Sequence, residues 1–278
     1  MKTKKLLSML IAFTVVFAVF TACQSDQSDE PLQEEGKISP EILAKLDAAY
    51  FDTSTAFETN FMGEDGVAVE DMFFTYAQID ELQPVDPLAK HYRTRNIVDA
   101  LPRVITISVD PDLGTIGSDA LDETIQMYND LNLRISFTRV TFGLRGRNKA
   151  DIEVTEFYEL ESGGFITLGR AAGFPSRRGD PAKGFGINSR WFELSIAPNV
   201  SELAGTMVHE IGHCIGLRHT DYQTRESCGV NINEGSAGVG AIHIAGTPTD
   251  SDFSSIMQSC GPAIDFNNND ITALEALY

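Results

Sequence analysis

Two hydrophobic periodicities alternate along the second half of the chain. Residues 104–109 are a β-rich run ended by Asp110-Pro111, which predicts a strand. Residues 118–131 place apolar side chains three and four positions apart, which predicts an amphipathic helix. Further strands are predicted at residues 134–142, 151–158, 165–171 and 191–196. Strands and helices mixed in this way indicate an α/β or α+β fold.

The longest helical pattern covers residues 199–217. Asn199 has the residue type of an N-cap, and Glu202 three positions later completes a capping box. The other elements expected are helices at residues 40–50 and 270–278 and, at residues 67–82, a strand followed by a short helix.

The first 22 residues have the pattern of a targeting segment. Lysines at positions 2, 4 and 5 precede an apolar run over residues 6–20, which is too short for a typical membrane span. Phe20-Thr21-Ala22-Cys23 resembles a bacterial lipobox, although an aliphatic residue is commoner at the position of Phe20. We therefore expect residues 1–22 to be a lipoprotein signal peptide and Cys23 to be lipidated. An ordinary secretory peptide is the alternative.

The segment after the signal peptide is polar and acidic. Residues 23–38 predict a linker, similar to the tethers on surface lipoproteins of Bacteroidetes. Residues 39–95 have mixed patterning and are interpreted as an N-terminal extension or a propeptide-like region. Residues 96–278 are expected to form the catalytic domain.

The charge balance limits which classes of partner the chain can bind. The chain has 21 basic and 40 acidic residues, and loss of the three signal-peptide lysines leaves 18 basic residues, a net charge of −22. Such a charge argues against binding to nucleic acid or to anionic lipid by electrostatics. We expect an extracytoplasmic monomer that contacts the membrane only through its N-terminal lipid.

Three cysteines remain beyond Cys23. In an oxidising compartment two of them can pair, and a bridge between Cys228 and Cys260 would close one loop after the last predicted strand. Pairing of Cys214 with either partner, or three small buried hydrophobes, are the alternatives.

Three of the five histidines fall in one motif, His209-Glu210-Ile211-Gly212-His213-Cys214-Ile215-Gly216-Leu217-Arg218-His219. His209 and His213 are four positions apart, so a helix presents both imidazoles to one ion. Gly216 permits a left-handed turn that brings His219 back as a third ligand. Three protein ligands leave one position open, which is typical of a catalytic zinc ion.

Glu210 follows the first histidine and lies about 100° round the helix. From there its carboxylate can contact a water at the metal without binding the metal, as a general base requires. The pattern predicts a zinc-dependent metalloendopeptidase that acts on peptide or protein substrates. A zinc amidase or hydrolase of another class, or a non-catalytic surface-binding lipoprotein, are the alternatives.

The motif, together with Ser255-Ile256-Met257, resembles the metzincins, with Met257 in the turn beneath the metal. The wording from His209 to Asp221 is similar to the dual-action HEIGH metallopeptidases, the family of myxobacterial protease B. Further matches lie at residues 244–248 and 266–270. The resemblance implies a twisted mixed sheet, an active-site helix and a smaller C-terminal subdomain. It also implies that residues 165–171 include an edge strand that pairs with substrate.

Three acidic positions have competing interpretations. Asp221 could replace His219 as a ligand, but a residue that orients a histidine is favoured. Asp110-Pro111-Asp112 and the Asn267–Asp270 segment carry clustered oxygens that could bind structural calcium. A turn and a helix N-cap are the favoured roles.

Overall fold

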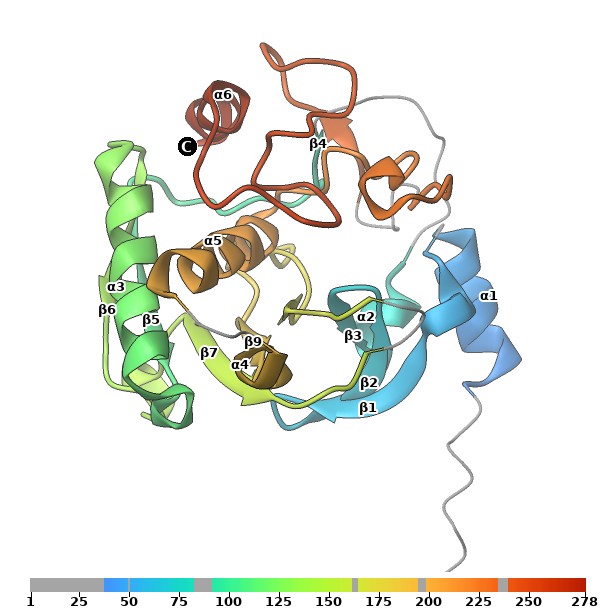
Figure 1. Ribbon diagram of the computed structural model, residues 1–278, viewed down its shortest axis with the longest axis horizontal. Helices are drawn as coiled ribbons and strands as arrows, with labels where there is room; N and C mark the ends of the chain where they lie inside the picture. Colours follow the sequence, from blue (N-terminus) through green and yellow to red (C-terminus); the bar gives the residue numbers. More distant parts are fainter. Residues whose placement is uncertain (1–37, 50, 83–91, 162–164, 195–198, 235–239) are drawn as a thin grey trace, which may run out of the picture. The chain divides into compact units, whose positions relative to one another are not determined.

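The helices and loops of the protein pack around a mixed β-sheet (Figure 1). The computed structural model describes residues 38–49, 51–82, 92–161, 165–194, 199–234 and 240–278. The helices are α1 (Pro40–Ala48), α2 (Tyr76–Asp80), α3 (Gly114–Asp130), α4 (Arg190–Leu194), α5 (Val200–Ile215) and α6 (Asn268–Leu277). The strands are β1 (Phe57–Phe61), β2 (Glu64–Val69), β3 (Met72–Thr75), β4 (Tyr92–Arg93), β5 (Arg103–Val109), β6 (Ile135–Arg139), β7 (Ile152–Phe157), β8 (Gly169–Ala171), β9 (Gly184–Asn188) and β10 (Ile242–His243).

The large sheet has the order β1-β2-β3-β8-β9-β7-β5-β6. On one side, β6, β5, β7 and β9 are parallel to one another. β8 runs antiparallel to β9, and β3 pairs with β8 in parallel. The hairpin strands β1, β2 and β3 complete the other side of the sheet. The prediction of an α/β chain with a mixed sheet is confirmed.

The two long helices pack against each other and against the sheet (Figure 1). The Tyr128 hydroxyl on α3 donates to the Val208 carbonyl on α5 at 2.9 Å, and Thr124 donates to the Ala204 carbonyl at 3.3 Å. Both donors are fully buried, so these bonds satisfy polar groups that would otherwise destabilise the core. They fix α5 against α3.

The element predictions fail mainly around β9. Residues 191–196 were expected as a strand, but α4 lies there, and Trp191 packs its ring against the apolar core from that helix. The strand in this part of the chain is β9, a few residues earlier. Its glycines have low β propensity, so its sequence does not show the pattern of a strand. Gly186 is required because a Cβ atom would stand 2.7 Å from the Phe157 ring.

The predicted extension shares this sheet. Residues 57–75 supply β1, β2 and β3, where one strand was expected, and Val67 and Phe74 are buried in the same core as α5. The described residues all belong to one compact unit, residues 35–278. The signal peptide, Cys23 and all but the last residue of the linker lie outside the described residues. Within the described residues, no helix has the length and apolar content needed to cross a membrane.

Candidate metal centre

Helix α5 positions His209 and His213 one turn apart. Asn199 caps the helix by accepting the Glu202 backbone N–H at 2.7 Å, which is the forward half of the predicted capping box. The two imidazole rings lie 4.8 Å apart, and both are at least 96% buried. A four-residue spacing on a helix therefore brings both rings to one point, as the sequence predicts.

Gly216 ends α5 and turns the chain toward His219. Its φ of 111° lies in the left-handed region that favours glycine. The backbone N–H groups of Gly216 and Leu217 both donate to the Gly212 carbonyl, at 3.0 and 2.8 Å. A Cβ atom on Gly216 would also stand 3.0 Å from Thr94 Oγ1. Glycine is required here by both conformation and space.

The Nε2 atoms of the three histidines converge. They lie 3.1 Å apart for His209 and His213, 3.2 Å for His213 and His219, and 3.3 Å for His209 and His219. All three rings are at least 96% buried. Three nitrogens at such separations enclose a single atom-sized position.

The opposite ring nitrogens show which atoms carry hydrogen. Each Nδ1 faces an oxygen acceptor: the Ile256 carbonyl at 2.7 Å for His209, the Leu217 carbonyl at 3.0 Å for His213, and a Glu234 carboxylate oxygen at 2.8 Å for His219. Carbonyl and carboxylate oxygens accept but do not donate, so each Nδ1 carries the proton in a neutral ring. Three Nε2 lone pairs then point at one another, an arrangement that a cation between them would stabilise.

A fourth ligand atom completes the cluster. Asp71 Oδ2 lies 2.8 Å from His219 Nε2, 3.4 Å from His209 Nε2 and 3.6 Å from His213 Nε2. The four ligand atoms all lie within 4.8 Å of one another, so these residues fit one metal ion. Burial lowers the pKa of His213 to about 4, which keeps that imidazole neutral and able to bind metal.

Glu210 lies next to the first ligand and is 98% buried. Its Oε2 atom has no hydrogen-bond partner among the described residues. Burial and, next, the Asp71 carboxylate raise the pKa of Glu210 well above its ordinary value. A cation between the histidines would oppose both effects. Glu210 is therefore a carboxyl group whose ionisation depends on what occupies the metal position.

Glu234 holds the third histidine from behind. Its carboxylate is buried with Arg218 and Arg225, each 3.4 Å away, and accepts the Ser259 hydroxyl at 3.0 Å. Burial alone would raise the pKa of Glu234, but His219 and the two arginines lower it to about 2. Burial opposes protonation of His219, yet Asp71 and Glu234 raise its pKa well above the ordinary range. Without a cation between the histidines, these two carboxylates favour a proton on His219, and a metal ion bound there would replace that proton.

Met257 packs under the metal-binding helix. A Cβ atom on Gly212 would stand 2.4 Å from Met257 Sδ, so the glycine makes room for the thioether. The turn that carries Met257 is held by Ser255, whose hydroxyl donates to Asp270 at 2.5 Å and accepts the Met257 N–H at 3.0 Å. The neighbouring Ile256 carbonyl is the acceptor for His209 Nδ1. This turn therefore orients a histidine ring directly.

Comparison with known proteins assigns the family. Residues 67–278 match the family described as Dual-action HEIGH metallo-peptidase. The chain belongs to this family. It is a metallopeptidase that hydrolyses peptide bonds, as the sequence predicts. No match was found among curated proteins.

Two solved structures of myroilysin are similar to this metallopeptidase. One, "Structure of myroilysin", is 13% identical with a TM-score of 0.42 and covers 67% of this chain and 97% of its own. The other, "Crystal structure of myroilysin", is 12% identical with a TM-score of 0.43 and covers 88% and 98%.

The metallopeptidase has one disulfide among its described residues, between Cys228 and Cys260, while Cys214 is free and buried. Asp221 lies between the two ends of this bridge. Its carboxylate accepts the Ser227 hydroxyl at 2.5 Å and the Ser259 hydroxyl at 2.7 Å. It therefore fixes two loops, and among the described residues its hydrogen bonds go to serines and not directly to a histidine.

Two residues of the site have weak or no sequence signals. Glu234 lies alone in a polar loop, and it takes the histidine-orienting role that was expected of Asp221. Asp71 follows Glu70 between two apolar runs, a pattern that fits a two-residue hairpin turn but says nothing of histidines.

The segments considered for calcium take the favoured roles. Asp110 caps a 3₁₀ turn over Pro111–Leu113, and Asn267 and Asp270 form the capping box of α6.

Proposed function

We propose that this metallopeptidase is a zinc-dependent endopeptidase in which His209, His213 and His219 hold the ion and Glu210 is the general base. The observation that carries the proposal is the convergence of three Nε2 atoms whose Nδ1 atoms all face acceptors. Neutral imidazoles arranged in this way suit zinc, and three protein ligands are the set typical of a catalytic zinc.

The residues around the metal position have separate roles in the proposed reaction. When bound, zinc acts as a Lewis acid toward a peptide carbonyl and lowers the pKa of water to about 7. Glu210 accepts the proton of the attacking water on its unpartnered Oε2 atom and then donates it to the leaving amine. Glu234 keeps His219 in the tautomer that binds metal.

Strand β8 places Glu210 for this role. A Cβ atom on Gly169 would stand 2.3 Å from Glu210 Oε1 and 2.7 Å from its Cγ and Cδ atoms. The glycine therefore lets the catalytic carboxylate lie directly against the strand. Burial and Asp71 raise the pKa of Glu210, and the positive charge of Arg170, which follows Gly169, opposes part of that rise.

The cellular location belongs to the same proposal. We propose that the chain is extracytoplasmic and anchored by a lipid on Cys23. The Cys228–Cys260 bridge supports an oxidising compartment. The test is metabolic labelling of the full chain with a radioactive fatty acid. Label in the unaltered chain and none in Cys23→Ser supports the anchor, and equal labelling of both contradicts it.

The activity is tested on one preparation of residues 24–278. Zinc content is measured first, and cleavage of a denatured protein mixture and a peptide library is then followed by mass spectrometry. Because the Asp71 carboxylate lies at the histidines, Asp71→Ala is assayed beside the unaltered chain. We expect one zinc ion per chain in both proteins. At least one of the two should cleave peptides internally, and a chelator and added Glu210→Gln should each abolish that cleavage.

Two outcomes contradict the proposal. Cleavage that persists in Asp71→Ala after both Glu210→Gln and chelation excludes a zinc mechanism. Stoichiometric zinc without hydrolysis of any peptide, in either chain, favours an amidase of another class or a binding protein.

A further inference from the structure

Strands β2 and β3 form a hairpin whose turn reaches the metal centre. Val69 pairs with Met72, so Glu70 and Asp71 are the two residues of the turn. Glu70 has a φ of 56°, a left-handed conformation that a two-residue hairpin turn requires and that is unfavourable for a glutamate. Surrounding contacts must stabilise an unfavourable turn of this kind.

Each turn residue contacts the metal-binding half of the chain. Asp71 Oδ2 lies within 3.6 Å of all three histidine Nε2 atoms, the position that a fourth metal ligand occupies. Glu70, whose side chain is 2% exposed, pairs with Arg225 at 2.8 Å. Arg225 in turn lies 3.4 Å from Glu234, the carboxylate behind His219. Two adjacent acidic side chains therefore fix the turn to the site.

The same hairpin covers the strand beside Glu210. The Ala171 N–H on β8 donates to the Asp71 carbonyl at 2.9 Å, and Met72 pairs with Ala171 in parallel. Without β3, this side of β8 would be a free sheet edge, the kind of edge to which extended peptides add as a strand. The sequence resemblance implied an edge strand here, but β8 is internal because β3 fills its outer side.

We propose that Asp71 is the fourth ligand of the metal and that the Glu70–Asp71 turn is an intramolecular plug. In this arrangement the chain binds zinc but is latent, because the carboxylate occupies the position that water needs and β3 occupies the β8 edge. The inference rests on the proposed zinc peptidase function. It assigns residues 57–75 of the predicted extension an inhibitory role.

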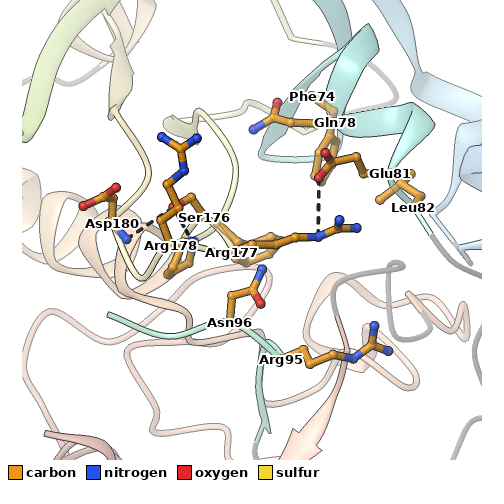
Figure 2. Close-up of a pocket in the computed structure, with 12 residues that line it drawn as sticks. Phe74, Gln78, Glu81, Leu82, Arg95, Asn96, Ser176, Arg177, Arg178 and Asp180 are labelled. Atoms are coloured by element: carbon orange, nitrogen blue, oxygen red, sulfur yellow. Dashed lines mark hydrogen bonds and ion pairs between the residues drawn. The ribbon is translucent and has the colours of Figure 1, made fainter. Parts of the chain in front are cut away.

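The packing behind the turn suggests how firmly the plug is held. Phe73 and Phe74 on β3 are at least 98% buried, so withdrawal exposes apolar surface and latency is stable in the intact chain. Beyond β3 the contact is looser. A pocket of about 580 Å³ separates α2 from residues 174–180, and Figure 2 shows Arg177 reaching across to Glu81. That ion pair is 3.8 Å long and more than 60% exposed on both sides, so it contributes little.

The first test measures access to the metal, not activity. Residues 24–278 are loaded with cobalt(II), and azide is titrated while the visible absorption spectrum is recorded. An internal carboxylate competes with added anions at a high effective concentration. We expect Asp71→Ala to bind azide at a concentration at least about tenfold lower than the unaltered chain does. Asp65→Ala, on the exposed part of the same hairpin, should behave like the unaltered chain.

Equal azide midpoints in the unaltered chain and Asp71→Ala overturn the inference. Should Asp71→Ala fail to fold by circular dichroism, Asp71→Asn replaces it, since the amide keeps the shape of the side chain and binds metal weakly. A midpoint in Asp71→Asn equal to that of the unaltered chain overturns the inference as well.

A second test separates latency from the peptidase activity on which it rests. With zinc bound, Asp71→Ala should cleave the peptide library at least about tenfold faster than the unaltered chain, and adding Glu210→Gln should abolish that cleavage. Equal, Glu210-dependent rates in both chains overturn latency and leave the peptidase intact. Altered azide binding without hydrolysis in either chain supports the ligand role and contradicts the peptidase function.

Discussion

The Nδ1 atom of His219 lies 2.8 and 3.0 Å from the two carboxylate oxygens of Glu234, a residue 15 positions further along the chain. Both side chains are at least 97% buried. A carboxylate in this place fixes the tautomer and the orientation of a metal-binding imidazole and makes it a better donor. Glu234 therefore orients the His219 ring and makes its Nε2 atom a better donor, without contacting the candidate metal position.

Replacing Glu234 with Gln should weaken zinc binding about 10- to 100-fold, because the neutral amide orients His219 less firmly. Zinc affinity is measured by competition with a chromophoric chelator. Glu226→Gln, an exposed glutamate in the same loop, is the matched control and should bind zinc like the unaltered chain. Unchanged affinity in Glu234→Gln would show that the carboxylate serves only the two arginines.

Removal of the metal should destabilise the fold. Three imidazole lone pairs then face one another without a cation, and a ligand present at about 1,000 times its Kd stabilises the native state by about 4 kcal/mol. Calorimetry with and without a chelator should show a clear fall in Tm. His213→Ala should abolish the difference and His243→Ala, outside the cluster, should keep it. A chelator effect that survives His213→Ala contradicts the assignment.

Gly169→Ala should lower the rate of peptide cleavage about 10²-fold, since a displacement of about 1 Å at a catalytic group has an effect of that size. The added Cβ atom would stand 2.3 Å from Glu210 Oε1, so the carboxylate must move. The rate is measured in an Asp71→Ala background, with zinc content determined on the same sample. Full activity at full zinc content would show that Glu210 acts from another position.

Ser255→Ala should destabilise the protein by about 1–3 kcal/mol, because it leaves a buried Asp270 oxygen and the Met257 N–H without their partner. The free energy of unfolding is obtained by urea titration. Ser254→Ala, one residue earlier and exposed, should cost less than about 0.5 kcal/mol. Equal losses in the two variants would mean that the Met257 turn does not depend on Ser255.

Cys228→Ser should destabilise the oxidised protein by about 2–4 kcal/mol, the range expected for loss of a bridge between residues 32 positions apart. A reductant should lower the Tm of the unaltered chain and leave that of Cys228→Ser unchanged. Cys214→Ala keeps the bridge and should retain the response to reductant. A response in Cys228→Ser would point to another disulfide.

The parts of the site that sequence analysis could predict are local. His209 and His213 share a face because a helix has a fixed periodicity, and Gly216 turns the chain because only glycine adopts its conformation there without strain. The family assignment rests on the same short segment and is confirmed by the match over residues 67–278. In contrast, β9 was missed because groups on other strands require its glycines. A Cβ atom on Gly186 would meet the Phe157 and Phe61 rings, and one on Gly184 would meet the Glu153 backbone.

The sequence by itself predicted three histidines as metal ligands with a carboxylate beside them, and it determined the peptidase family. The tertiary structure decided which distant groups surround that set. Asp71 meets His219 across 148 positions of the chain, and it does so because β3 pairs with β8 at one point in the sheet order. A sheet joins strands by backbone hydrogen bonds whose geometry is the same for most side chains, so periodicity cannot specify which strands are neighbours. The carboxylate that faces the three histidines is therefore a property of the folded sheet.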